Sequence, residues 1–286
     1  GNTTVPATQS AATYSGGTNG ILVSAATGTG GFNTTNYSIT YASGTLTVAA
    51  LPVTITGAAV YSGSTSFNTA TSGSSLSVTN AVNGDTVTVS GTGTLSSASA
   101  GSRSLNSLSG LTLSSSNYTL TGATSAITVS QAPLGVVLAA TYSGTTTVTP
   151  TSFTLTGLVN SETVTSLSSA VLSSANVSGN GSNYVVSITK GAGTATLSNY
   201  SITAAYNATT GITTTNTATL NTKAITIAAS NQSTTYGTAL ALGSSSYSLT
   251  SGSLGTGDAI TGVTLTQGGN TTVPATQSAA TYSGGT

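Results

Sequence analysis

The sequence predicts an all-β protein built from tandem, sandwich-like modules in a semi-rigid linear array. Three observations predict it: short runs that alternate apolar and hydroxyl side chains, clusters of Gly, Asn and Ser between those runs, and one segment of eighteen residues that occurs twice. Alternation over a few residues is typical of a strand with one buried face. We find no run of helix-forming residues with a 3.6-residue period.

The strand predictions rest on Val, Ile, Thr and Tyr, which suit a pleated, half-buried surface. The predicted strands cover residues 37–41, 46–48, 53–55, 86–90, 118–121, 127–129, 153–155, 184–188, 200–203 and 225–227. Successive side chains of a strand point to opposite faces, so one face of each run enters a core. We expect these apolar side chains to be buried: Ile39, Leu46, Val53, Ile55, Leu120, Ile127, Ile202, Ile225 and Ile227.

A long internal repeat sets the expected organisation. Residues 1–18 and 269–286 both read GNTTVPATQSAATYSGGT, an offset of 268 residues. Such identity indicates an array with a 268-residue sequence period. We therefore expect this chain to be one stretch of a continuous polymer. We also expect no membrane insertion in this region, because no apolar run is long enough to span a bilayer.

Shared landmarks divide the period into three modules. A Tyr followed closely by Gly opens each module, one acidic residue follows it, and an Asn-Tyr pair comes near the end. The opening tyrosines are Tyr61, Tyr142 and Tyr236; the acids are Asp85, Glu162 and Asp258; the pairs are residues 36–37, 117–118 and 199–200. The tyrosines are spaced by 81, 94 and, through the repeat, 93 residues.

These landmarks give four segments. Residues 1–50 are the C-terminal part of a module that the preceding repeat completes, and residues 51–133 and 134–222 are two whole modules. Residues 223–286 are the N-terminal part of the next module, with residues 269–286 duplicating residues 1–18. The joints are short and two contain Pro, which stiffens them, so the array should be semi-rigid.

The low charge excludes several classes of partner. Charged residues are 2% of the chain and the net charge is zero. Nothing here could neutralise nucleic-acid phosphates or bind an anionic membrane. An uncharged surface rich in hydroxyl groups can pack against copies of itself at little desolvation cost, so the expected partner is the protein itself, along the array and between neighbouring fibres.

The residue inventory also argues against an enzyme. His and Cys are absent, which removes Ser-His and Cys-His nucleophiles, disulfides and the usual zinc ligands. The acids occupy equivalent positions in successive modules, so they should lie too far apart to act as a catalytic pair. We expect no catalytic, cofactor-binding or metal-binding residues and no cofactor.

Other readings of single residues remain open. Each acid caps a turn by accepting backbone N–H bonds, or binds calcium. Each opening tyrosine is a core or corner residue, or a platform for sugar stacking. Lys190 or Lys223 could form a Ser-Lys dyad, Lys190 and Glu162 could form an isopeptide bond, and residues 86–88 carry a Thr-x-Thr motif of the kind that ice-binding arrays use.

The module sequences resemble known families. Residues 51–133, with VTITGAAVYSGSTSF, NGDTVTVSGTGTLSSASAG and SSNYTLTG, resemble a YDG-type module, although Ser62 stands where the usual pattern has Asp; residues 134–222 resemble a divergent copy. Residues 223–286 plus 1–50, with ITIAASNQSTTYGTAL and TTNYSITYASGTLTV, resemble the MBG type. Both types are glycine-rich, mostly-β modules of giant bacterial surface adhesins.

The resemblance implies an exported repeat protein outside the cell or on its surface, bacterial in origin and without enzymatic activity. With the composition, it leads us to expect a structural repeat region of a giant extracellular protein that forms protective or adhesive fibres or a biofilm-like matrix. The alternative is a passive stalk of a cell-surface adhesin whose ligand-binding domains lie elsewhere.

Overall fold

The computed structural model describes residues 3–16, 20–202, 206–207, 211–212 and 215–282. It is all-β, with 43% strand and 3% helix, which confirms the all-β part of the predicted fold class. The helical elements of the described ranges are three 3-10 turns: η1 (Thr34–Asn36), η2 (Val177–Gly179) and η3 (Leu197–Asn199). No described segment is a helix of the length and apolarity that crossing a membrane requires.

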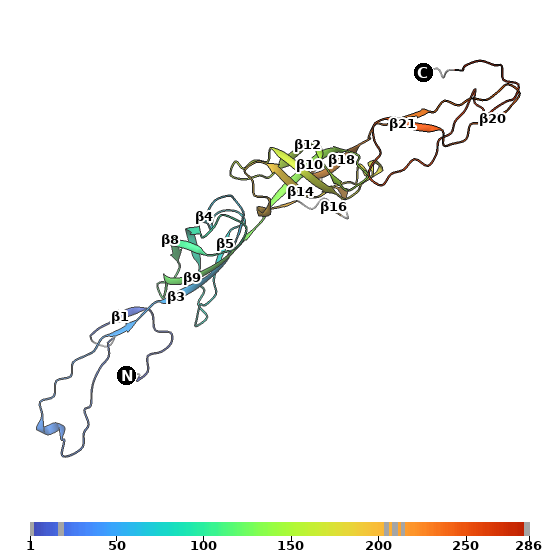
Figure 1. Cartoon of the computed structure of the whole chain (residues 1–286). Helices are drawn as coiled ribbons and strands as arrows, with labels where there is room; N and C mark the ends of the chain where they lie inside the picture. The colour runs from blue at the N-terminus through green and yellow to red at the C-terminus, as the bar shows by residue number, and fades with distance from the viewer. Residues whose placement is uncertain (1–2, 17–19, 203–205, 208–210, 213–214, 283–286) are drawn as a thin grey trace. The chain divides into compact units, whose positions relative to one another are not determined.

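The chain forms two compact units, shown in Figure 1: Gly1–Ala132 with Ser198–Tyr200, and Pro133–Leu197 with Ser201–Thr286. The first unit contains a four-stranded sheet in the order β5-β3-β9-β7. Its strands are β3 (Leu51–Val60), β5 (Ser75–Val78), β7 (Gly101–Arg103) and β9 (Tyr118–Ser130). β3 and β9 run parallel, and the two outer pairs are antiparallel.

A second, three-stranded sheet lies against the first (Figure 1). It consists of β4 (Ser66–Asn68), β6 (Val89–Leu95) and β8 (Leu105–Leu113), all antiparallel. The core lies between the sheets: Val53, Ile55 and Ile127 are buried as predicted, and Phe67 and Leu111 are buried from the second sheet. Burial of each such side chain stabilises the fold by about 1.5–3 kcal/mol.

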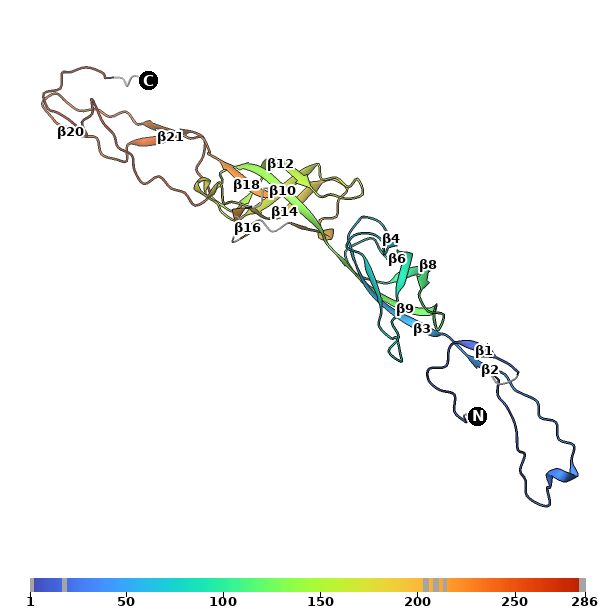
Figure 2. The same cartoon turned by 180° about the vertical axis from the view of Figure 1, so that it is seen from behind.

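The second unit shares several of these strand pairings, and its strands are labelled in Figure 2. β10 (Ala132–Thr141) pairs in parallel with β18 (Asn216–Asn221) and antiparallel with β12 (Pro150–Thr156), as β3 does with β9 and β5. β15 (Tyr200–Ile202) completes that sheet. The other sheet is β11 (Thr147–Val148), β13 (Ser166–Leu172) and β14 (Val185–Ala192), in the arrangement of β4, β6 and β8.

The terminal segments, residues 1–50 and 223–286, contain only two-stranded sheets where they are described. β1 (Ala12–Tyr14) pairs with β2 (Leu46–Val48), β19 (Thr226–Ala229) with β21 (Tyr247–Ser251), and β20 (Leu240–Ala241) with β22 (Thr272–Val273). A further two-stranded sheet, β16 (Tyr206–Asn207) with β17 (Gly211–Ile212), lies between them in sequence. The buried apolar side chains run from Val53 to Leu220, outside both terminal segments.

Several burial predictions are therefore wrong. Ile39, Ile225 and Ile227 are 36%, 39% and 40% exposed. No second sheet covers the apolar side of these segments in the described residues, so alternation alone does not bury them. Leu46, Leu120 and Ile202 are half-buried.

Two predicted strands also differ from the structure. Residues 37–41 form no paired strand, and Tyr37 instead stacks on Phe32 with ring centroids 5.3 Å apart. The strand predicted at 86–90 begins only at Val89, because the N–H of Thr88 donates to the Ser114 hydroxyl at 2.9 Å rather than to a backbone carbonyl. Of the strand predicted at 200–203, Thr203 lies outside the described residues.

Candidate functional site

Each acidic residue follows a tight turn. The N–H of Asp85 donates to the carbonyl of Val82 at 2.9 Å, and the N–H groups of Glu162 and Asp258 donate to residues 159 and 255 at 3.0 Å each. In the first of these turns Asn83 and Gly84 have φ of 57° and 78°. Asn and Gly tolerate that left-handed conformation better than other residues, so the local sequence specifies the turn.

Tyrosine hydroxyls bind two of the carboxylates. The hydroxyl of Tyr118 donates to Oδ2 of Asp85, and that of Tyr142 donates to Oδ2 of Asp258, both at 2.9 Å. These contacts correct the expectation that the two acids accept backbone N–H bonds as turn caps. A hydrogen bond to a carboxylate is stronger than one between neutral groups, so each pair can hold two segments together.

Both tyrosines have altered acidity. The hydrogen bond to Asp258 is the main reason that the pKa of Tyr142 lies above its ordinary value, and partial burial adds to it. For Tyr118 the N–H of Val82 lowers the pKa, but burial and the Asp85 carboxylate outweigh it and raise the pKa overall. Both phenols therefore stay protonated donors to a higher pH than a free tyrosine.

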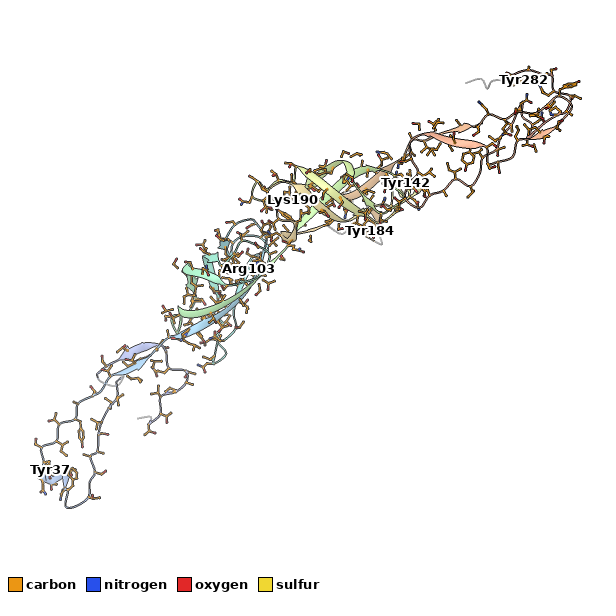
Figure 3. The ribbon with its side chains drawn as sticks, in the orientation of Figure 1. Tyr37, Arg103, Tyr142, Tyr184, Lys190 and Tyr282 are labelled. Atoms are coloured by element: carbon orange, nitrogen blue, oxygen red, sulfur yellow. The ribbon has the colours of Figure 1, made fainter. Side chains whose placement is uncertain are left out.

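The three opening tyrosines differ in environment. Tyr61 is buried, and its ring meets the ring of Tyr200 edge-on with centroids 5.4 Å apart. Tyr142, labelled in Figure 3, is half-buried, and Tyr236 is 69% exposed. The core interpretation fits Tyr61, and the corner interpretation fits Tyr142.

The loop before Asp258 lies directly on the segment that begins with Tyr142. The N–H of Thr256 donates to the carbonyl of Ser143 at 2.7 Å. A Cβ on Gly255 would approach a ring carbon of Tyr142 to 2.8 Å, and a Cβ on Gly144 would approach the N of Thr256 to 2.6 Å. Only glycine fits at both positions, which explains the glycine two residues after Tyr142.

Asparagine side chains make recurring contacts that the sequence analysis missed. Oδ1 of Asn117 accepts from the N–H of Ala11 at 2.9 Å, and Oδ1 of Asn199 accepts from the N–H of Ala100 at 3.0 Å. Both asparagines immediately precede a tyrosine landmark. The Asn-Tyr pair was the available signal, because its Asn is present in every module.

The three cations bind backbone oxygens. Lys190 donates to the carbonyls of Gly193 and Ala195, and Lys223 donates to residue 254 at 3.2 Å. Arg103 donates to the carbonyls of residues 99, 100 and 102. In the part of the chain that is described, no cluster of three potential metal-ligating side chains occurs. The hydrogen bonds of these cations hold loops, a structural role.

The repeated segment keeps its internal contacts at both of its positions. The N–H of Gln9 donates to Pro6 and that of Gln277 to Pro274, both at 3.0 Å. Its tyrosine hydroxyl bonds the carbonyl four residues earlier in each case, at 2.8 Å for Tyr14 and 2.9 Å for Tyr282. These turns are thus set locally by the sequence.

Comparison with known proteins identifies one family. The model of the YDG domain matches residues 46–126, so the YDG resemblance is confirmed for that stretch, a β-rich domain. No curated protein matches the chain, and no solved structure matches it.

Proposed function

We propose that this chain is a structural repeat region of a giant extracellular bacterial protein that forms fibres or a protective or adhesive matrix. The observation that carries the proposal is the identity of residues 1–18 and 269–286, which supports a tandem array with a 268-residue period. The strand pairings shared by the sheets in residues 51–132 and 133–221 support an array of modules.

The chemistry of the chain supports a structural role. Two carboxylates are engaged by tyrosine hydroxyls, and the three cations by backbone carbonyls. The sequence has no His or Cys to act as a base or a nucleophile. We therefore propose that the chain is not an enzyme and that it associates with other copies of the same protein, along a fibre and between fibres.

The YDG match supports a relation to surface adhesins, and we extend the resemblance to the MBG type for residues 223–286 plus 1–50. On that basis we propose an extracellular or cell-surface location. The sparse charge supports lateral association, because two hydroxyl-rich, uncharged surfaces can approach without repulsion or costly desolvation.

Electron microscopy tests the proposal. The purified chain, concentrated at neutral pH, should form fibres that associate side by side, and an antibody against it should label the outside of intact source cells. A stalk would give separate, unassociated particles at every concentration, and that result would favour the spacer alternative. Labelling confined to the cell interior would contradict both readings.

A further inference from the structure

Each terminal segment has a strand with an unpaired edge in the described residues. β2 pairs only with β1, and β19 pairs only with β21. In residues 51–132 the central strands β3 and β9 pair on both edges, in the order β5-β3-β9-β7. A free edge flanked by exposed apolar side chains is a template for another strand.

The pair β1–β2 has the register of the pair β7–β9. Ala12 lies opposite Val48, as Gly101 lies opposite Val129. The residue before each of these edge strands is an alanine whose N–H donates to the Asn of an Asn-Tyr pair. β1 and β2 are thus the equivalents of β7 and the end of β9.

The pair β19–β21 has the register of β3–β5. Ile227 lies opposite Leu249, as Ile55 lies opposite Val78. The sequences agree as well, since residues 225–227 read ITI and residues 53–55 read VTI. The two terminal segments therefore hold the two complementary halves of the β5-β3-β9-β7 sheet.

We propose that residues 223–286 of one copy of this chain bind residues 1–50 of a second copy, with β19 and β2 side by side and parallel. The proposal rests on the proposed fibre-forming function, because this contact is what would close the module between successive repeats of the array. Gly57 lies opposite Ile127 in the parallel pair β3–β9. The equivalent residues, Ala229 of one copy and Leu46 of the second, lie opposite each other in the joint.

The repeated eighteen-residue segment pairs with a different strand at each of its two occurrences. In residues 269–286 Val273 pairs with Leu240, and in residues 1–18 residues 12–14 pair with β2. Val273 corresponds to Val5, so the two pairings use different parts of the same eighteen residues. One copy of the segment can therefore make both pairings in the completed joint.

A shared carbonyl places Tyr236 within the joint. The carbonyl of Ala7 accepts from Nδ2 of Asn83 at 3.0 Å, and the carbonyl of the corresponding Ala275 accepts from the N–H of Gly237 at 3.1 Å. When the carbonyl of one such alanine accepts both of these hydrogen bonds, Tyr236 of one copy lies beside the turn that precedes Asp85 of the second.

Tyrosine and acid contacts at other landmarks indicate how Tyr236 is held there. The opening tyrosine Tyr142 hydrogen-bonds the carboxylate of Asp258. The opening tyrosine Tyr61 instead contacts the ring of Tyr200, which is the tyrosine of an Asn-Tyr pair. Tyr118 and Asp85 are already bonded to each other. Tyr236 of one copy thus docks on the Asp85–Tyr118 pair of the second copy.

Disulfide trapping tests the register, since the chain has no cysteine of its own. Ala229→Cys and isotope-labelled Leu46→Cys chains are mixed under mild oxidation, and mixed dimers are counted by mass spectrometry. Parallel neighbours lie within disulfide reach, so the mixed dimer should exceed the control by at least about tenfold. The control replaces Leu46→Cys with Leu22→Cys, an exposed site in the same segment. Equal yields overturn the register.

Sedimentation velocity tests the tyrosine. Tyr236→Ala should weaken self-association by about tenfold or more, the loss expected of a large buried contact, whereas Val186→Ala, exposed on β14, should leave it unchanged. Equal effects overturn the role of Tyr236. Fibres without the mixed disulfide overturn this joint but leave the proposed function standing. Mixed disulfides without fibres support the joint and contradict the proposed function.

Discussion

Residues 53–55 and 225–227 have nearly the same sequence but different environments. Val53 and Ile55 are 1% and 0% exposed, whereas Ile225 and Ile227 are 39% and 40% exposed. The first strand has β9 on its second edge and the β4-β6-β8 sheet over its apolar face, and the second has only β21. The difference shows that an alternating strand gains its burial from partners far away in sequence.

The largest expected effect contrasts these two strands directly. Ile55→Ala should lower the free energy of unfolding of its unit by about 2–5 kcal/mol, since it leaves a cavity in a closed core. Ile227→Ala should cost less than about 1 kcal/mol, because its side chain is already partly in water. Urea unfolding followed by tyrosine fluorescence measures both. Equal losses would show that residues 223–286 have a core of their own.

A second contrast concerns amide side chains. Asn216 is 1% exposed and bonds both the N–H and the carbonyl of Val185. Asn216→Ala leaves these buried groups without that partner and should cost about 1–3 kcal/mol. The matched variant Gln232→Ala removes an exposed amide from the terminal segment and should change stability by less than about 0.5 kcal/mol. Thermal unfolding followed by circular dichroism compares them, and a neutral Asn216→Ala would contradict the argument.

Glycine substitutions compare the backbone packing of the same regions. A Cβ on Gly57 would lie 2.3 Å from the carbonyl oxygen of Ser75, whereas a Cβ on Gly44 would make an ordinary 3.5 Å contact with Ile21. Gly57→Ala should therefore cost about 1–3 kcal/mol as an overpacked sheet. Gly44→Ala should be close to neutral. Equal unfolding midpoints in urea for the two variants would show that β3 and β5 can move apart to accommodate the added methyl group at little cost.

The smallest expected effect is a pH dependence in the alkaline range. The pKa of Tyr142 is raised by its bond to Asp258, so this bond contributes its full stabilisation below the ordinary tyrosine pKa of about 10 and loses it as the pH rises through the raised value. An absorbance titration of tyrosinate should lose a component that ionises above the ordinary tyrosine range in Tyr142→Phe. Tyr37→Phe, in the segment without a closed core, is the control.

The stability of the whole chain should depend little on pH. Apolar burial and sheet hydrogen bonds do not titrate, so unfolding midpoints should change little between about pH 3 and pH 10. A steep loss of stability near pH 4 would instead assign a major role to the three acids.

The sequence by itself determined most of the strands, the turns between them and the absence of His and Cys. Alternation located β3, β9 and β12 because a half-buried strand needs a period of two. Clusters of Gly, Asn and Ser located the turns between strands because few other residues adopt a left-handed conformation. These are local effects, so a single segment of sequence carries them.

Only the tertiary structure decided which apolar faces are closed and which polar groups meet. The bond between Tyr118 and Asp85 joins residues 33 positions apart, and the parallel pairing of β3 with β9 spans most of a module. Neither follows from local pattern, because any of the many similar strands could offer the same edge. Ile55 and Ile227 differ for that reason: a pattern states which face can be buried, and a neighbouring sheet decides whether it is.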